Sequence, residues 1–428
     1  MIFDANPVIL PLVARNDLRL SPEMVALVEE TLALCERGDT RLRVLSRVVV
    51  VQAIIWMAVF RQNSIAGVLT TIFAVFPWVD QFTDSAFYNA RERIGSFPLQ
   101  LLFERLSKRI SYADMWRGFR IRAMDGTSMN LQDTPDVVTA FGKPNYATNG
   151  TKRKAGNPQM KIVAIMCPLV KAVLHVIPDR HNGGERQKAL HLVKRLAEGD
   201  LLLFDSGFSG APLFQACIGQ RVRFVGRIAV SWKPKILEAL GLNDWIVRTS
   251  REQGRLTLRL IHFRYKDQLL RILTDLVDPI EYPASEIVRL YLRRWEQEMG
   301  FGYLKRLAGP AFGNVAVPLR SKSTGMVLQE FYALLIAYNL VCLRGLETAQ
   351  FQEVPATRVS FTQTLTDLRL ALLGFTRLRQ SSRVLPERRK RSYPRALRVR
   401  RQRYPDRKPD YGPVHWDAEN RLVESIAV

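Results

Sequence analysis

The stretch YLRRWEQEMGFGYLK, residues 291–305, carries the most specific pattern in the chain. It lacks proline and is rich in Leu, Arg, Glu, Gln and Met, so it predicts a helix from about residue 284 to 307. On a continuous helix of about 100° per residue, four side chains of different chemistry share an arc of about 60°: Tyr291, Arg294, Glu298 and Lys305. A carboxylate on such an arc can ligate a cation while basic groups hold phosphate oxygens. Taken one residue at a time, a solvated amphipathic face is the simpler interpretation.

The charge of the whole chain favours a polyanionic partner. Lys and Arg total 63 against 40 Asp and Glu, which gives a net charge of +23 and a pI near 10.3. An excess of this size is typical of proteins that bind nucleic acid. An acidic membrane surface is the competing partner, but we find no lipid-anchor motif, so we expect nucleic acid and no membrane.

The remaining composition predicts a cytoplasmic protein. None of the four cysteines forms a C-x-x-C pair, so we interpret them as buried thiols in a reducing compartment. The N-terminus lacks the basic start and apolar core of a signal peptide. The apolar run 48–60 is shorter than the roughly 20 residues that span a membrane, which makes it a buried core helix.

Residues 1–115 are predicted to form a helical domain, because apolar residues recur there at helical spacing. Ser64 and either Asp84 or Ser85 are the candidate N-caps. The polar side of residues 88–93 is interpreted either as a DNA-facing surface or as a solvated face. The predicted helices are 24–34, 42–61, 64–76 and 85–106.

Residues 116–345 are predicted to form an α/β catalytic domain of the ribonuclease H-like class. Three strands come first, at 119–125, 159–166 and 172–177. They are followed in alternation by helix 183–196, strand 200–205, helix 209–215 and strand 223–229. The uninterrupted apolar strand 200–205 indicates burial on both faces. Three further strands predict a β-rich insertion over about 230–280, at 245–249, 255–265 and 269–276. Residues 325–344 predict a final apolar core helix.

Two carboxylates occur where apolar strands are expected to end, at Asp125-Gly126 and Asp205-Ser206-Gly207. Each by itself is ordinary turn chemistry. In the predicted fold, however, the first and fourth strands end side by side, and ligands collect at strand ends in sheets flanked by helices. A late helix that crosses there adds Glu298. Three converging carboxylates with no histidine fit Mg²⁺ or Mn²⁺, and two such ions can catalyse phosphodiester exchange.

The motif Y-x2-R-x3-E-x6-K resembles the Tyr-Arg-Glu-Lys signature of DDE transposases from bacterial insertion sequences, the IS-four group. The similarity covers most of the chain and includes the β-rich insertion. It extends to the segments MDGTS around Asp125, LLLFDSGF around Asp205, RRWEQE around Glu298, Leu273–Leu276 (LTDL), Tyr303–Lys305 (YLK) and the closing ALLIAYNL.

The resemblance implies metal-dependent DNA cleavage and strand transfer at the ends of an insertion sequence. It makes Asp125, Asp205 and Glu298 the catalytic acids and metal ligands. Tyr291, Arg294 and Lys305 become contacts to DNA phosphates, and Trp295 either stacks on a base or packs in the core. It also implies that residues 1–115 help to recognise DNA ends, and that the enzyme works as a homodimer in a synaptic complex.

Residues 346–428 are predicted to form a basic C-terminal region that grips phosphates without sequence choice. Between residues 377 and 408, Lys and Arg far outnumber the two acids, Glu387 and Asp406. A solvated tail is the alternative interpretation. For the whole chain, two other functions stay open: a structure-specific nuclease on the same fold, which cuts but does not join, and a catalytically vestigial basic DNA-binding protein.

Overall fold

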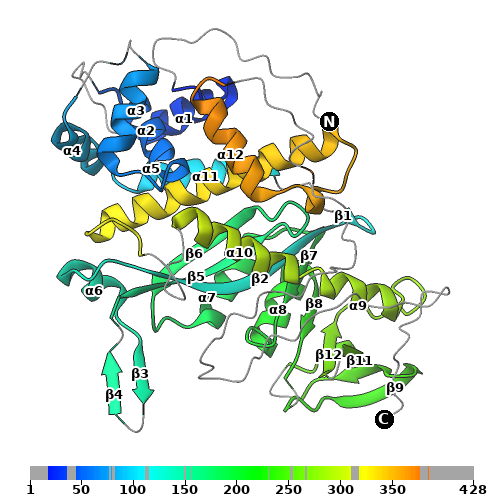
Figure 1. The fold of residues 1–428 in the computed structure, drawn as a ribbon. Coiled ribbons are helices and arrows are strands. Elements are labelled where there is room, and N and C mark those ends of the chain that lie inside the picture. The colour runs from blue at the N-terminus through cyan, green and yellow to red at the C-terminus, as the bar shows by residue number, and fades with distance from the viewer. Residues whose placement is uncertain are drawn as a thin grey trace, which may run out of the picture. The chain divides into compact units, whose positions relative to one another are not determined.

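The structure is a computed structural model (Figure 1), and it falls into two compact units. The first unit lies within residues 1–113, 126–183 and 298–385, and the second within 114–125, 184–297 and 386–428. Backbone is described for 18–35, 45–76, 79, 82–110, 115–148, 151–154, 156–229, 231–250, 254–265, 268–309, 318–375 and 384. The side chains of 145–148, 151–154 and 295–298 lie outside the described set.

Helices dominate the first unit, and their starts follow from local capping. The hydroxyls of Ser21, Ser46 and Ser64 each accept a hydrogen bond from the backbone N–H three residues later, which satisfies a donor that the helix leaves unpaired. The prediction for Ser64 is therefore confirmed. The helices of the bundle are α1 (Pro22–Ala33), α2 (Arg47–Val59), α3 (Ile65–Val75), α4 (Asp84–Ile94), α5 (Phe97–Ile110), α11 (Thr324–Phe351) and α12 (Phe361–Leu372).

The expected helix 85–106 is wrong as one element, because the chain breaks between α4 and α5. Gly95 has φ of 69° there, a left-handed conformation that glycine adopts without strain. The N-cap of α4 is Thr83, whose hydroxyl accepts from the N–H of Ala86, so neither Asp84 nor Ser85 caps this helix. Both deviations reflect cap geometry that apolar periodicity does not carry.

The long helix α11 is the centre of the first unit's core, with α2, α5 and α12 packed against it (Figure 1). Its length and apolar composition would allow it to cross a membrane, but 83% of its most apolar stretch is buried inside the protein. Within the core, the amide of Asn339 accepts from the N–H of Val173 and donates to its carbonyl oxygen. These two bonds tie α11 to the edge of strand β6 (Val173–Arg180).

Strand β2 (Phe119–Asn130) contributes residues to both units. In the first unit the strand order is β6–β5–β2, with β5 (Gln159–Met166) antiparallel to β6. This unit also holds α6 (Pro135–Phe141), the hairpin β3 (Asn145–Thr148) and β4 (Thr151–Lys154), the 3-10 turn η2 (Ala356–Arg358) and most of α10 (Trp295–Ala308).

In the second unit the order is β2–β7–β8–β12–β11–β10–β9, and β2, β7 and β8 run parallel. The aliphatic side chains of β7 are fully buried, as its uninterrupted apolar sequence predicts. The elements are β1 (Met115–Trp116), α7 (Glu185–Val193), β7 (Asp200–Phe204), α8 (Ala211–Gly219), β8 (Arg223–Arg227), β9 (Lys235–Gly241), β10 (Asp244–Arg248), β11 (Thr257–Tyr265), β12 (Gln268–Thr274) and α9 (Ala284–Leu292). The antiparallel part β9–β12 is the expected β-rich insertion, with β9 as an additional strand. Together these elements confirm the ribonuclease H-like α/β class.

Two predicted boundaries near the candidate site are wrong. Strand β2 continues past Asp125 to Asn130, because its second half pairs with β5 and tertiary pairing outweighs the turn tendency of Asp-Gly. The expected helix 284–307 is interrupted at Arg293 and Arg294, which form a turn between α9 and α10. The N–H of Arg294 bonds to the carbonyl of Tyr291, three residues back, so the last turn of α9 tightens before the chain changes direction.

Candidate active site

Two of the predicted acids lie at neighbouring parallel strands of the second unit: Asp125 is in β2, and Asp205 directly follows β7. Strands β2 and β7 pair with Met124 opposite Phe204, and the next residues along the two chains are Asp125 and Asp205. Adjacent strands run about 4.8 Å apart, and side chains at one register share a face of the sheet. The structure therefore brings these two carboxylates together at the end of β7, and both are half-buried.

Asp205 also has a local role in the turn that follows β7. Its Oδ1 accepts from the N–H of Ser206 at 2.6 Å, and its carbonyl accepts from the N–H of Phe208 at 3.1 Å. Turn chemistry therefore contributes to the choice of Asp at this position. The same carboxylate lies 3.9 Å from Nη1 of Arg227, at the end of β8.

Asp125 faces an arginine from the predicted signature. Nη1 of Arg294 lies 3.4 Å from Oδ2 of Asp125, and Arg294 is only 5% exposed. The guanidinium carbon also lies 5.9 Å from the ring centroid of Tyr291, which is 2% exposed in the last turn of α9. Burial raises the pKa of the Tyr291 hydroxyl to about 12, although Arg294 opposes this shift. The tyrosine is therefore neutral at physiological pH.

The prediction that residues 291–305 present four polar side chains on one arc of a continuous helix is wrong. Because the turn at 293–294 separates α9 from α10, Tyr291 and Arg294 do not share a continuous helical register with residues 298 and 305. Lys305 lies in the last turn of α10 and is exposed. Trp295 and Glu298 occupy the first turn of α10, and their side chains lie outside the described residues.

The chemistry of the described acids fits a hard divalent cation. Both donors are carboxylates, half-exposed and at one register, and oxygen ligands of this kind suit Mg²⁺ or Mn²⁺. Among the side chains that the structure describes, no three His, Cys, Asp or Glu residues cluster as a metal site. Glu298 is outside that set, so the two aspartates form the described part of the candidate centre.

Two basic residues near the site were not anticipated. Arg227 approaches Asp205, and Nε of Arg186 in α7 donates to the carbonyl of Gly207 at 3.2 Å. Both arginines belong to the second unit and lie next to the turn that follows β7. The available signal was Arg227 at the end of a buried strand, RFVGR, adjacent to the strand that precedes Asp205. Sequence alone does not state which strands are neighbours.

The polar side of α4 shows no basic excess. Its exposed residues include Asp84, Glu92 and Arg93, while Arg91 is 4% exposed and donates to Oε1 of Gln329. A phosphate-binding face requires net positive charge, so these residues favour the solvated-face interpretation. The role of the N-terminal helices in recognising DNA ends stays a prediction.

Comparison with known proteins identifies the family. The chain belongs to the DDE transposases: the family model described as "Transposase DDE domain" matches residues 116–340, and the one described as "Insertion element 4 transposase N-terminal" matches residues 20–104. It is similar to the transposase InsG for insertion sequence element IS4 of Escherichia coli (strain K12), with 26% identity over 92% of this chain and 94% of the relative.

Two more distant similarities accompany this match. The putative transposase InsZ of Escherichia coli (strain K12) is 24% identical over 42% of this chain and 58% of its own length. A piggyBac transposase, solved as a synaptic complex with hairpin DNA, aligns with a TM-score of 0.42 at 12% identity, covering 88% of this chain and 85% of that chain. The second likeness is too remote to bear on the fold.

The expected family and function are thereby confirmed. The protein is a transposase of the DDE class that acts on DNA, and its reaction cleaves DNA and transfers strands. Enzymes of this class depend on divalent metal ions, in agreement with the oxygen donors at Asp125 and Asp205. Neither the nuclease nor the vestigial DNA-binding protein is favoured.

Proposed function

We propose that this transposase uses Asp125, Asp205 and Glu298 to hold two Mg²⁺ ions, for which Mn²⁺ can substitute, while it cuts insertion-sequence ends and joins them to target DNA. The observation that supports this most directly is that Asp125 and Asp205 each follow the last paired residues of β2 and β7, Met124 and Phe204. Ions held by these carboxylates would activate a water or a DNA 3′-hydroxyl and would stabilise the leaving oxygen. The protein's part is to hold carboxylates and phosphates in place.

Chain connectivity supports Glu298 as the third acid. Arg294 contacts Asp125, and Glu298 follows four residues later in the first turn of α10. Four residues span at most about 14 Å even when fully extended, so the backbone of residue 298 stays near that contact. We propose that the carboxylate of Glu298 joins the two aspartates as the third metal ligand.

The cationic signature residues differ in how accessible they are. Lys305 is exposed and can approach a phosphate directly. Arg294 and Tyr291 are buried beside Asp125, so their contact with DNA requires the turn at 293–294 to open, or Arg294 to leave Asp125 when a cation binds. For Trp295 we propose base stacking, with core packing as the alternative.

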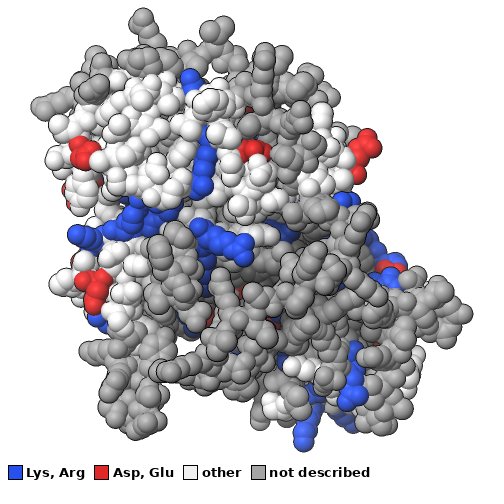
Figure 2. Space-filling view, in the orientation of Figure 1, with Lys and Arg blue, Asp and Glu red and all other residues white. Residues whose placement is uncertain are grey.

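The distribution of basic residues indicates further contacts with DNA phosphates outside the candidate metal site. Figure 2 shows broad areas of Lys and Arg and only small areas of Asp and Glu on the described part of the visible face. Apart from residue 384, the basic segment 377–408 lies outside the described residues, and we propose that it adds sequence-independent phosphate contacts. We also propose a homodimer in the synaptic complex and action on nucleoid DNA in a bacterial cytoplasm.

The test is Asp205→Asn, which removes the charge but keeps an oxygen that can accept from the N–H of Ser206. Asp278→Asn is the matched control, because Oδ1 of Asp278 accepts from the N–H groups of Ile280 and Glu281 in an ordinary turn. With labelled end-containing DNA and Mg²⁺, we expect Asp205→Asn to slow cleavage by at least about 10²-fold and Asp278→Asn to leave it unchanged.

Each outcome separates the competing functions. Wild-type cleavage together with joined products supports the proposal. Cleavage without joining identifies a nuclease, and binding without cleavage identifies a vestigial enzyme. Unchanged cleavage by Asp205→Asn rejects this residue as a metal ligand.

A further inference from the structure

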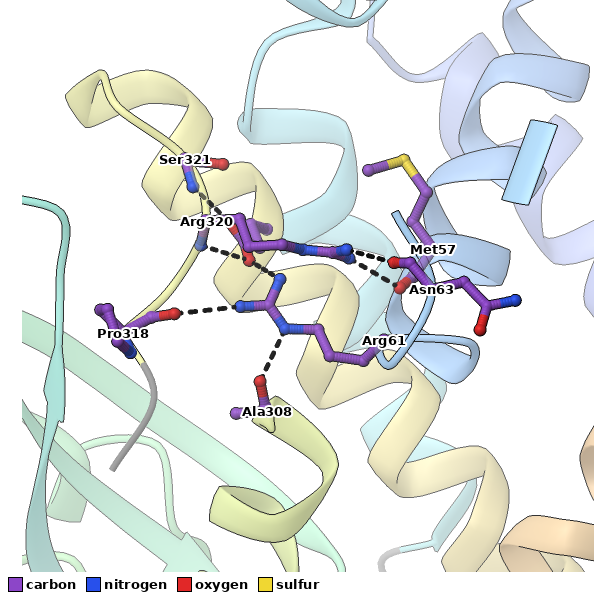
Figure 3. A network of polar contacts seen from close by, with 8 residues as sticks. Met57, Arg61, Asn63, Ala308, Pro318, Arg320 and Ser321 are labelled. Atoms are coloured by element: carbon purple, nitrogen blue, oxygen red, sulfur yellow. Dashed lines mark hydrogen bonds and ion pairs between the residues drawn. The ribbon is translucent and has the colours of Figure 1, made fainter. Parts of the chain in front are cut away.

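A buried arginine of the first unit binds the C-terminal end of α10, the helix whose first turn contains Glu298. Arg61 follows α2, and its Nε donates to the carbonyl of Ala308, the last residue of α10, at 2.7 Å (Figure 3). Nη2 donates to the carbonyl of Pro318 at 3.3 Å, and Nη1 pairs with the carboxylate of Glu330 in α11. One side chain therefore joins α2, α10 and α11.

Arg320 makes the reciprocal connection. Its Nη1 donates to the carbonyl of Asn63 at 2.6 Å and its Nη2 to that of Met57 at 3.4 Å, so it binds the end of α2 while Arg61 binds the end of α10. Glu330 accepts from the N–H groups of Arg320 and Ser321 at 3.0 and 2.8 Å (Figure 3). The two helix ends are thus clamped around one carboxylate.

The electrostatics of this cluster match a fixed structural joint. Arg61 and Glu330 are 7% and 8% exposed. Burial acts to raise the pKa of Glu330, but Arg61 and the hydrogen bonds from residues 320 and 321 bring it below its usual value, so the carboxylate stays charged. Burial and the neighbouring Arg61 lower the pKa of Arg320 to about 10. A buried charged cluster with this many directed bonds accepts few alternative geometries.

We propose that Arg61 is a positioning residue for the reaction: by anchoring the C-terminal end of α10, it fixes the helix that carries Glu298. This inference rests on the proposed metal-binding role of Glu298. The last carbonyls of a helix lack partners within the helix and favour a cation, and Arg61 supplies both a donor and a charge. Glu298 precedes Ala308 by about 15 Å along a rigid rod, so a shift at one end moves the other.

The test compares Arg61→Lys with Arg91→Lys in the full chain. A lysine at 61 keeps a cation beside Glu330, but it lacks the planar fork that reaches two carbonyls as well. Arg91 is the matched control, since it is also buried and donates to Gln329 of α11, while the described residues show no hydrogen bond from it to α10. We measure Mn²⁺ binding from the spin-resonance signal of free Mn²⁺. Arg61→Lys is expected to weaken binding by about tenfold, and Arg91→Lys is expected to leave it unchanged.

A second measurement locates the effect. Amide hydrogen exchange at residues 303–308 is expected to accelerate in Arg61→Lys and to stay at the wild-type rate in Arg91→Lys. Wild-type Mn²⁺ affinity in Arg61→Lys, or equal weakening in both variants, overturns the inference. Glu298→Gln tests the underlying function separately: if this variant binds Mn²⁺ as the wild type does, Glu298 is not a ligand, whatever Arg61→Lys shows.

Discussion

At the residue scale, the contact between Arg294 and Asp125 is long: Nη1 and Oδ2 lie 3.4 Å apart, near the outer limit of a hydrogen bond. The Asp125 side chain is 22% exposed, so a divalent cation can reach its carboxylate from solvent. We propose that a bound cation would replace this contact. The guanidinium of Arg294 would then be available to a phosphate, whose oxygens suit its planar fork.

The raised pKa of Tyr291 predicts that the protein loses stability at alkaline pH. Its folded-state pKa is raised from 10 to about 12, so the folded protein retains a proton that the unfolded chain releases. The contribution of Tyr291 to the free energy of unfolding is fully present below about pH 10 and is lost as the pH rises towards 12. A shift of this size corresponds to about 3 kcal/mol. Urea unfolding should show a steeper loss of stability over this range in the wild type than in Tyr291→Phe.

The exposed Tyr88 provides the control for that measurement, since Tyr88→Phe removes a hydroxyl at a solvated position. We expect this variant to follow the wild-type pH profile. Parallel profiles for the wild type and Tyr291→Phe would contradict the assignment of the alkaline loss to Tyr291.

At the scale of elements, α10 contains two glycines with different surroundings. A Cβ on Gly300 would lie 2.6 Å from the methyl group of Met166, 3.1 Å from the hydroxyl of Tyr338 and 3.4 Å from the carbonyl of Lys171. That hydroxyl is itself buried and donates to the same carbonyl at 2.6 Å. A Cβ on Gly302 would meet nothing within 4 Å. The lack of a side chain at Gly300 therefore allows neighbouring residues to pack closely, whereas no described residue packs against Gly302.

This difference predicts opposite effects of one substitution. Gly302→Ala should stabilise the protein by about 0.5–1 kcal/mol, because alanine loses less backbone entropy in a helix. Gly300→Ala should destabilise it by about 1–3 kcal/mol through overpacking. Denaturant unfolding of both variants measures the two values, and equal stability of the variants would show that Gly300 is not a packing constraint.

At the scale of the whole molecule, the N-terminal helices do not complete their own core. Side chains of α11 such as Phe331, Leu334 and Tyr338 belong to the same buried cluster as those of α2 and α5. Buried polar groups also depend on α11, since Arg91 pairs with Gln329 and Arg61 with Glu330. Residues more than 200 positions apart in the chain therefore fold together.

A fragment of residues 1–115 is accordingly expected not to fold by itself. Without α11, its apolar faces and the buried guanidinium of Arg91 would be exposed or unpaired. Circular dichroism should show partial helicity without a cooperative thermal transition, and addition of residues 318–375 should restore one. A sharp transition in the isolated fragment would establish the N-terminal region as an autonomous domain.

Local sequence patterns were sufficient for most elements of the catalytic fold. Continuous apolar runs identified β5 and β7, and alternation identified most of the insertion, because side-chain burial follows these periods. The family resemblance rested on residue types and spacing, and the family match confirmed it. Helix α12 was not predicted, although its sequence is amphipathic; the basic residues that follow it dominate the composition of this region.

By itself, then, the sequence determined the class of fold, the chemical character of the candidate acids and the need for a polyanionic partner, since composition, period and spacing are local properties. Only the tertiary structure decided that β2 continues past Asp125, that the signature helix divides at Arg293–Arg294, and that Arg61 closes the end of α10. The reason is physical. Strand extension, helix breaks and buried arginine partners depend on which distant segments lie alongside, and residues 61 and 308 meet only after the chain has folded.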